Sequence, residues 1–290
     1  MKRAFLQLHI AIFLAGFTGV FGRLITMNEG LLVWYRMLFS SILLLLFFGF
    51  NSKIARLPKR ELLPLIGIGS LIALHWVFFY GSIKYANVSV GLVCFSMIGF
   101  FSALLSPLIL KTKINWIEVF LGLLAILGVY LIFHFDQAKQ TGIILGTISA
   151  FLASLFPIFN KRIVDTYSPE TISFYELFGG WLLLNAMLPF YDQIFEIQFH
   201  LPSLNDFLWL LVLSLFCTVW AFNLSVRSLQ KISPFTVNLS YNLEPVYGIA
   251  LAFLLFREHN ELDISFFIGL SIIFLTVVIQ SVLTWRKSIG

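Results

Sequence analysis

Long apolar runs alternate with short polar segments along the chain of 290 residues. A bilayer core about 30 Å thick needs about 20 apolar residues in one helix. Ten runs come close to this length, and none of the segments between them is large enough for a soluble domain. The pattern therefore predicts an all-α integral membrane protein with ten spans, at residues 6–22, 31–50, 62–83, 88–110, 116–135, 142–159, 171–189, 205–226, 235–256 and 264–283.

The basic residues predict how these spans are oriented. If the N-terminus is cytoplasmic, 14 of the 19 Lys and Arg residues fall in inner segments, four fall in outer segments, and Arg36 lies within a span. Cytoplasmic loops of membrane proteins carry such an excess of positive charge. We therefore expect both termini to be cytoplasmic and the protein to lie in the inner cell membrane.

The composition supports the membrane assignment. The chain is 59% hydrophobic and 11% charged, whereas soluble domains average about 25% charged residues. The net charge of +5 follows from the topology, so no nucleic-acid partner is expected. Cys94 and Cys217 lie within apolar runs without metal-ligand spacing, and nothing resembles a nucleotide-binding P-loop. We expect helix-packing cysteines, no metal and no cofactor.

Residues that start helices occur at three predicted boundaries. Ser233 precedes Pro234, and Ser168 precedes Pro169, so that each pair offers a capping hydroxyl followed by a proline suited to the first helical position. Asn28 can cap the second span in the same way.

The chain divides near its midpoint into residues 1–135 and 142–290, joined by a linker at 136–141. Short motifs recur between the two parts: "VWYRMLFSS" resembles "SFYELFGGW" at an offset of 140, and "SIKYANVSVGL" resembles "SLQKISPFTVN" at an offset of 146. Because each part holds an odd number of spans, the second repeat must be inverted in the membrane. Inverted repeats are typical of secondary transporters, which bind substrate near the midplane between the repeats.

Four stretches of the chain carry a resemblance to a known family: Tyr35-Arg36, "GSIKYANVSVG" (81–91), "SPETISFYELF" (168–178) and "NLEPVYGIALAFLLFREHNELD" (242–263). Through these motifs the whole chain resembles the EamA family of the drug/metabolite transporter superfamily. The first half departs from the family pattern, with Ile98-Gly99 in place of a common proline and Lys111-Thr112 in place of an acidic residue. The resemblance implies a ten-helix carrier, commonly an exporter of small metabolites or amino acids, and leaves the solute open.

Glu244 is the main candidate for a substrate-binding residue. It lies ten residues into the ninth span, about 15 Å deep and near the midplane. At 100° per residue it shares one face with a polar set. The proline beside it is expected to free the carbonyl of Tyr241. The alternative is a protonated glutamate locked in a hydrogen bond between helices. The residues that share this helix face with Glu244 are Asn238, Tyr241, Asn242, Pro245 and Gly248.

His75 and Asn223 are further candidates for the midplane. His75 lies about 20 Å from the inner edge of the third span, and Asn223 lies near its counterpart in the second repeat. A histidine here could line a cavity and carry a coupling proton. It could equally donate to a neighbouring carbonyl.

Arg36 and Glu176 occupy matching positions in the repeats with opposite charges. Counting from opposite faces, each lies about 8 Å deep, which leaves roughly 15 Å between them in a 30 Å core. We therefore expect no salt bridge, and we expect each residue to lie near one opening of a common pathway. For Arg36 the alternative is a side chain that reaches back to the outer interface.

Together these features favour a secondary carrier that moves a small polar or zwitterionic, amino-acid-like metabolite by alternating access. The expected partners are that solute, the lipid bilayer, a coupling proton or counter-solute, and a second copy in a homodimer. An intramembrane enzyme acting on lipid is the first alternative, although no nucleophile–base pair or metal motif supports it. A membrane scaffold without transport is the second.

Overall fold

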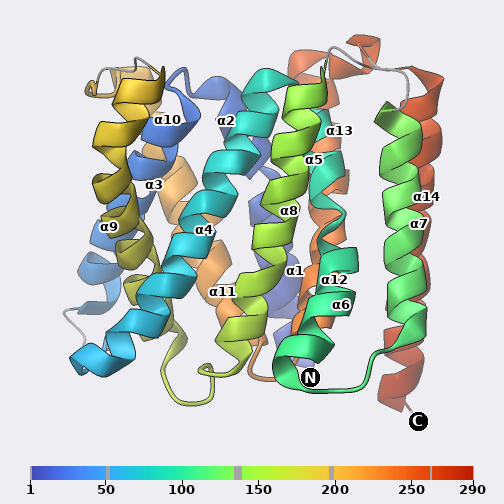
Figure 1. Ribbon diagram of the computed structural model, residues 1–290, viewed down its shortest axis with the longest axis horizontal. Coiled ribbons are helices and arrows are strands. Elements are labelled where there is room, and N and C mark those ends of the chain that lie inside the picture. Colours follow the sequence, from blue (N-terminus) through green and yellow to red (C-terminus); the bar gives the residue numbers. More distant parts are fainter. Residues whose placement is uncertain (1, 50–52, 134–138, 196–198, 262, 290) are drawn as a thin grey trace.

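The computed structural model describes residues 2–49, 53–133, 139–195, 199–261 and 263–289, which form helices and their connections without a strand (Figure 1). The first half contains α1 (Lys2–Gly16), α2 (Thr18–Leu24), α3 (Glu29–Leu44), η1 (Leu45–Gly49), α4 (Lys59–Tyr85), α5 (Val88–Phe95), α6 (Ile98–Leu110) and α7 (Trp116–Phe133). The second half contains α8 (Gln140–Lys161), α9 (Pro169–Phe195), α10 (Leu204–Ser214), η3 (Leu215–Trp220), α11 (Ala221–Ser228), α12 (Pro234–Ser240), η4 (Tyr241–Leu243), α13 (Glu244–Phe256), η5 (Glu258–Glu261) and α14 (Ile264–Ile289).

Seven helical segments among the described residues are long and apolar enough to cross a membrane. Two shorter apolar segments, Trp116–Ile132 and Ile264–Thr276, accompany them. The predicted helical, multi-pass membrane protein is therefore confirmed, whereas the number of ten spans stays a prediction. The seven are Lys2–Leu24, Glu29–Gly49, Lys59–Tyr85, Val88–Leu110, Gln140–Lys161, Leu204–Ser228 and Pro234–Phe256.

The three predicted helix starts are confirmed. The side chain of Asn28 accepts a hydrogen bond from the backbone of Leu31 at 2.9 Å. The hydroxyl of Ser233 accepts from the backbone of Thr236 at 3.2 Å, and Pro234 opens α12. Ser168 accepts from the backbone of Thr171 at 3.2 Å before α9. Each side chain satisfies a backbone donor that the first helical turn leaves without a partner.

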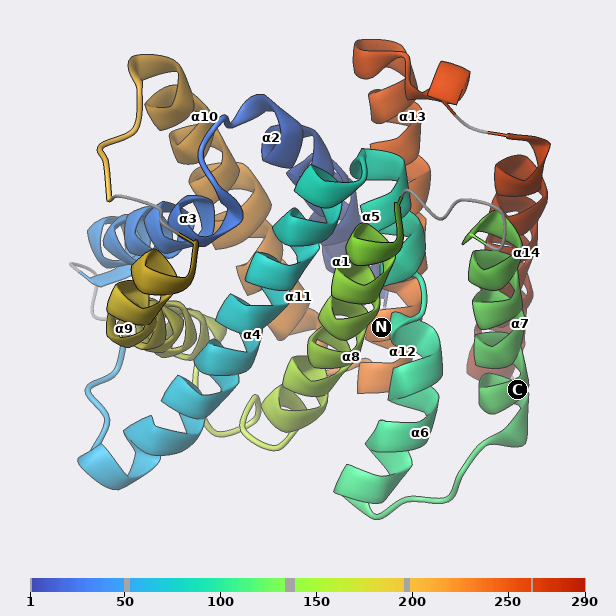
Figure 2. The same ribbon diagram turned by 45° about the horizontal axis from the view of Figure 1, so that its top comes forward.

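The two halves of the chain interlock. The six most extensively packed helix pairs each take one member from each half: α4 with α8 and α9, α7 with α14, α1 with α11, α3 with α9, and α6 with α8 (Figure 2). Helix α8 already begins at Gln140, so the last residues of the predicted linker are helical. Residues 136–138 of that linker lie outside the described residues.

Several spans are interrupted at mid-length. Phe17 separates α1 from α2, Ser96 and Met97 separate α5 from α6, and the tight turn η4 separates α12 from α13. Helices α6 and α13 both end at a basic residue with positive φ, Lys111 at 57° and Arg257 at 56°. These two residues are 146 positions apart, which is the offset of the second of the two recurring motifs, so the two halves share a backbone feature.

Glycines allow two of the helix pairs to approach closely. A Cβ on Gly69 of α4 would lie 1.9 Å from the carbonyl oxygen of Glu176 in α9. A Cβ on Gly128 of α7 would lie 2.8 Å from the carbonyl oxygen of Gly269 in α14. No side chain fits at these crossings, so the backbones themselves are in contact.

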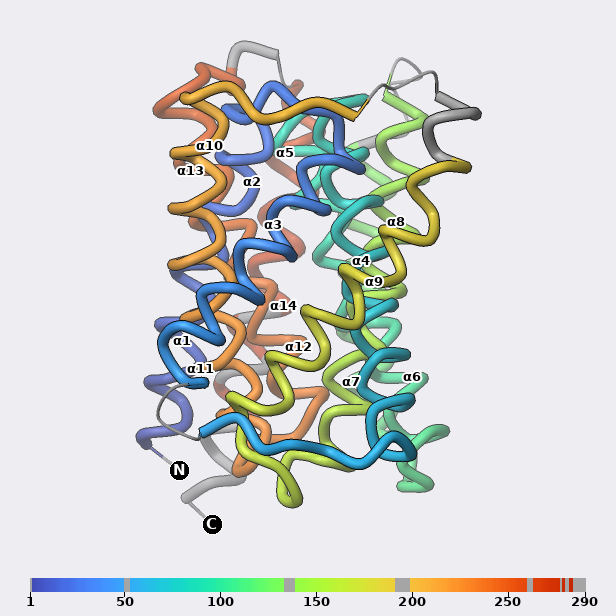
Figure 3. Tube along the Cα trace, turned by 90° about the vertical axis from the view of Figure 1, so that its left-hand side faces the viewer, coloured from blue at the N-terminus to red at the C-terminus, as the bar shows by residue number. Residues whose placement is uncertain are grey.

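The start of α1 and the end of α14 lie at the same end of the bundle, which we call the terminal end (Figures 1 and 3). The connection from α8 to α9 lies at this end too, while α2 ends and α5 begins at the opposite end, called the distal end. Helices α3 and α9 pack against each other and run obliquely (Figure 3).

Candidate functional site

A cavity of about 60 Å³ lies in the core at the interruptions of the spans. Half of its lining residues come from each half of the chain. Residues on both sides of each helix interruption line the cavity. An interrupted helix changes direction or winding, so its side chains and backbone groups point in new directions. The lining consists of Ala15, Thr18, Arg36, His75, Trp76, Phe79, Phe95, Ile98, Phe156, Pro157, Cys217, Ala221, Phe222, Asn238, Tyr241 and Glu244.

Arg36 is buried in this cavity wall, with 1% of its surface exposed. Its Nε donates to Thr218 Oγ1 at 2.8 Å, its Nη1 to the Tyr80 hydroxyl at 2.8 Å, and its Nη2 to the carbonyl of Cys217 at 3.3 Å. The guanidinium carbon lies 3.7 Å from the centre of the Trp76 ring, a cation–π distance. A side chain held in this way does not reach back to the interface, so the snorkelling interpretation is wrong.

The depth expected for Arg36 is also corrected. Counting along one helix placed it near the outer opening, apart from the midplane residues, but its side chain lines the same cavity as Glu244. Residue counting measures depth along a helix axis, and it ignores both the reach of a long side chain and the oblique path of α3 (Figure 3).

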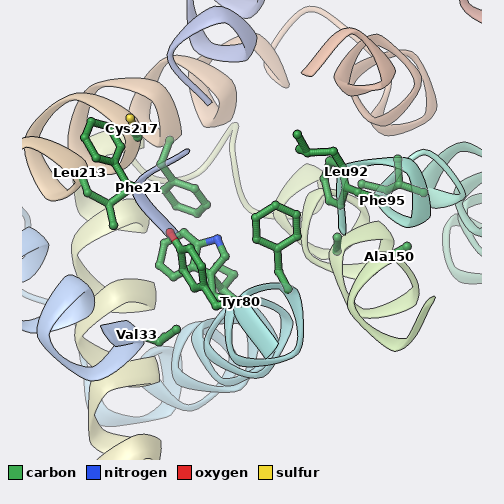
Figure 4. Close-up of a cluster of buried hydrophobic side chains, with 14 of the residues drawn as sticks. Phe21, Val33, Tyr80, Leu92, Phe95, Ala150, Leu213 and Cys217 are labelled. Carbon is green, nitrogen blue, oxygen red and sulfur yellow. The ribbon is translucent and has the colours of Figure 1, made fainter. Parts of the chain in front are cut away.

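Two of the three acceptors for Arg36 come from η3, where the chain forms a wider turn than an α-helix. Thr218 Oγ1 donates back to the carbonyl of Leu213, five residues earlier, at 3.1 Å. Such wide turns free carbonyl groups from the regular pattern, and here the carbonyl of Cys217 accepts from Arg36. The sequence carries no signal for this turn. Figure 4 shows Cys217 and Phe95, both in the lining, among the buried side chains of the core.

Trp76 and Tyr80 were not proposed as arginine partners from the sequence. They lie four residues apart on α4, so they occupy one face of that helix and meet the guanidinium together. An aromatic pair at this spacing, in a span next to one with a lone arginine, is the signal that could have found them.

Glu244 is 5% exposed and lines the cavity at the first turn of α13. Among the described residues no hydrogen bond or ion pair is formed by its carboxyl group, on which the charge of Arg36 acts electrostatically. The expected free carbonyl of Tyr241 is not found, because η4 is tightly wound and the backbone of Glu244 donates to that carbonyl.

The three asparagines of the predicted site have different surroundings. Asn238 lines the cavity, and its amide donates to Ser102 Oγ at 3.0 Å and to the carbonyl of Ser154 at 3.2 Å. Asn242 and Asn223 are buried but absent from the cavity lining, and each has an amide nitrogen without a hydrogen-bond partner. The tight turn at η4 rotates Asn242 away from the face that a regular helix would give it.

Tyr241 and Gly248, which were predicted to share the face of Glu244, also have different surroundings. Tyr241 lines the cavity with Glu244. Gly248 instead packs against the backbone of Gly16 in α1, since a Cβ there would lie 2.9 Å from that carbonyl oxygen. Small residues at this crossing bring α13 close to α1.

His75 lines the cavity and is also tied to a neighbouring helix. Its Nδ1 lies 3.0 Å from the carbonyl oxygen of Ser149 in α8, and Ser149 Oγ lies 2.8 Å from the same nitrogen and 3.1 Å from the carbonyl of His75. A carbonyl only accepts, so Nδ1 carries the proton and the neutral ring keeps Nε2 as an acceptor. His75 therefore both lines the cavity and donates to a neighbouring carbonyl, while its role in carrying a coupling proton stays a prediction. The rings of Phe79, Phe95 and Phe156 surround it.

Glu176 is not in the cavity lining. Its side chain is fully buried, and its Oε2 accepts from Asn160 Nδ2 at 3.2 Å. Among the described residues no ion pair joins Glu176 to Arg36, whose guanidinium donates to Thr218, Tyr80 and the carbonyl of Cys217. The burial contradicts the placement of Glu176 at an open mouth.

A polar cluster joins the two halves at the distal end. The carboxylate of Glu258, fully buried, accepts from Arg23 at 2.6 Å, from Ser89 Oγ at 2.6 Å, and from the backbone of Val88 and Ser89 at 3.2 and 3.0 Å. We call these four residues the Glu258 clasp. The carboxylate satisfies donors at the start of α5 and neutralises Arg23 at the end of α2.

Comparison with known protein families shows to which family the chain belongs. The sequence profile of the EamA-like transporter family matches residues 2–134 and again residues 140–282. The chain belongs to the EamA-like transporter family. It is therefore a multi-pass membrane transporter, and the resemblance seen in its motifs is confirmed.

Individual proteins similar to this chain are distant in sequence. An uncharacterized transporter of Archaeoglobus fulgidus is 27% identical over 62% of the chain, and the match spans 62% of that protein's own length. An uncharacterized transporter of Helicobacter pylori is 24% identical over 83% of the chain and 81% of its own length. A crystal structure of 15% identity superimposes with a TM-score of 0.71 over 99% of both chains, which supports the fold.

Proposed function

We propose that this EamA-like transporter is a secondary carrier for a small zwitterionic, amino-acid-like solute. The observation that carries the proposal is one cavity lined by a buried arginine and a buried glutamate that are not bonded to each other. Arg36 would bind a carboxylate, since its planar guanidinium suits that group. Glu244 would bind an ammonium group, and the phenylalanine rings around His75 suit flat or apolar side chains.

The present cavity is too small for this solute. A volume of about 60 Å³ has room for a few water molecules, whereas sites for small ligands occupy roughly 300–1,000 Å³. Binding therefore requires the helices around the breaks to separate, as alternating access demands. The Glu258 clasp would close the distal end in this state.

The proposal also includes a membrane topology. Helices α7, α9 and α14 would join the seven long apolar segments to make ten spans in two inverted repeats, residues 1–135 and 142–290. Both termini would be cytoplasmic in the inner cell membrane, and a coupling proton or a counter-solute would drive net export. A homodimer remains part of the proposal. The basic residues of the predicted inner segments support this orientation.

The test is exchange of labelled solutes by the purified protein in liposomes. Zwitterionic amino acids should exchange, while the same compounds lacking either the carboxylate or the ammonium group should not compete. Glu244→Gln should abolish exchange in a protein that elutes as a folded species. Full exchange by that variant would remove Glu244 from the site, and absence of exchange by every zwitterion tested with the unaltered protein would overturn the proposed solute class.

A further inference from the structure

Glu176 and Asn160 form a buried pair away from the substrate cavity. Asn160 lies in the last turn of α8 and Glu176 in the second turn of α9, and both side chains are completely buried. The amide nitrogen of Asn160 donates to Glu176 Oε2 at 3.2 Å. The pair lies toward the terminal end, where α8 is connected to α9 (Figure 1).

The two other side-chain oxygens of the pair cannot hydrogen-bond to each other if the carboxyl group is ionised. Glu176 Oε1 and Asn160 Oδ1 are both enclosed and have no hydrogen-bond partner. Each is an acceptor in a carboxylate and an amide, and unpaired buried acceptors are rare because they lose their hydration without compensation. One proton on Oε1 turns that atom into a donor, and the acid and the amide then present complementary groups on both sides.

Among the described residues no ion pair compensates the charge that an ionised Glu176 would carry, and the hydrogen bond to its carboxyl group is the one from Asn160. The helices packed against it carry ionisable side chains, but none of those described bonds to the Glu176 carboxyl group. They are Lys59, Arg60, Glu61, His75, Tyr80, Lys84 and Tyr85 on α4, Glu29, Tyr35 and Arg36 on α3, Arg227 on α11, Lys161 on α8, and Glu170 and Tyr175 on α9 itself.

We propose that Glu176, paired with Asn160, is a proton-binding site separate from the solute cavity, and that it binds the proton which the carrier couples to transport. An isolated carboxylate in this apolar surrounding would be very costly. The proton therefore leaves only when the helices part and water reaches the carboxyl group. The coupling role rests on the proposed transport function, whereas the proton site itself does not.

The Glu176–Asn160 pair lies where a separation of its helices would also move the walls of the cavity. The backbone of Glu176 contacts Gly69 of α4 without an intervening side chain. Helix α4 carries His75 and Trp76 in the cavity lining, and α8, which carries Asn160, also carries Phe156 and Pro157. Opening the α8–α9–α4 crossing at the terminal end to release the proton would therefore shift two walls of the solute cavity.

Infrared spectroscopy tests the proton site without any solute. The carbonyl stretch of a protonated carboxylic acid is measured for Glu244→Gln and for Glu244→Gln/Glu176→Gln at pH 7, so that Glu244 contributes to neither spectrum. The single variant should show a band that the double variant lacks. A glutamine at 176 keeps the hydrogen bonds to Asn160, so it preserves the packing. Identical spectra of the two folded variants would overturn the proposal.

Asn160→Leu provides a second measurement. It removes the acceptor for the proposed O–H group, and the Glu176 band should shift to higher frequency while keeping its intensity. An unshifted band would show that the acid is not bonded to Asn160 and would overturn the pairing.

Transport measurements test the coupling separately. In liposomes with an imposed pH gradient, Glu176→Gln should keep solute exchange but accumulate no more solute than it does without the gradient. Gradient-driven accumulation equal to that of the unaltered protein would overturn the coupling role. If no solute is transported by any form, the proposed function fails while the infrared result still decides the proton site.

Discussion

Arg36 and Glu244 line one buried cavity from opposite halves of the chain, yet the arginine is fixed by three hydrogen bonds and the glutamate by none among the described residues. Arg36 and Glu244 therefore have different structural roles. Arg36 supports the packing of α3, α4 and η3 as well as the cavity, while Glu244 presents its carboxyl group to the cavity alone. Substitutions at the two positions should differ accordingly.

For Arg36, replacement by lysine should be damaging. Lysine keeps the charge but cannot reproduce the planar fork that reaches Thr218, Tyr80 and the Cys217 carbonyl. Each charged hydrogen bond lost costs about 1.5–3 kcal/mol, so both Arg36→Lys and Arg36→Gln should lower the unfolding temperature and abolish exchange. Thermal unfolding in detergent and liposome exchange measure this, with Arg56→Lys in an exposed connection as the control. Normal transport by Arg36→Lys would contradict the fixed geometry.

For Glu244, replacement by glutamine should leave folding almost unchanged. No hydrogen bond of its carboxyl group among the described residues is lost, so the free energy of unfolding should change by less than the typical point-mutant value of about 1 kcal/mol. Solute exchange should nevertheless disappear. Glu118→Gln, at the start of α7 and outside the cavity, is the matched control and should exchange normally. A strongly destabilised Glu244→Gln would indicate a structural glutamate instead.

Two glycines in one turn of α4 give a sharp packing test. A Cβ on Gly69 would lie 1.9 Å from the Glu176 carbonyl oxygen, whereas nothing lies within 4 Å of a Cβ on Gly67. Gly69→Ala should force α4 and α9 apart and cost about 1–3 kcal/mol. Gly67→Ala should be neutral or stabilise by up to about 1 kcal/mol, because alanine favours a helix. Thermal unfolding of both variants decides the point, and equal stability would rule out the close crossing.

The Glu258 clasp should control access from the distal end. Glu258→Gln replaces a buried carboxylate with a neutral group, weakening its bonds to Arg23 and to the start of α5. The cavity carries a native thiol, Cys217, so an impermeant thiol reagent reports on opening. Its labelling rate should rise in Glu258→Gln, and Cys217→Ser in the same background should remove the signal. An unchanged rate would show that the clasp does not hold this end closed.

The sequence predicted the parts of this molecule that depend on local chemistry. Apolar runs gave the long helices, and Asn28 and Ser233 cap them as expected because a cap involves residues within one turn. Glu244, Tyr241 and Asn238 were grouped correctly on the cavity lining, since they lie close together on one segment.

What the sequence missed depends on contacts between helices. Arg36 meets Thr218 and Tyr80 from other spans, and no periodicity along α3 contains that information. Asn242 was misplaced because η4 changes the angle per residue within two residues of Glu244. A helical wheel assumes a constant angle, so it fails where a span is broken, and the breaks are where the cavity lies.

The indole of Trp76 lies 3.7 Å above the Arg36 guanidinium. A carboxylate that binds this cation would change the electric field at the ring, and tryptophan emission responds to such fields. The cavity thus contains its own optical probe. In a variant that keeps Trp76 and replaces the other tryptophans with phenylalanine, titration with an unlabelled solute would give its dissociation constant directly, without transport and without a bound reporter.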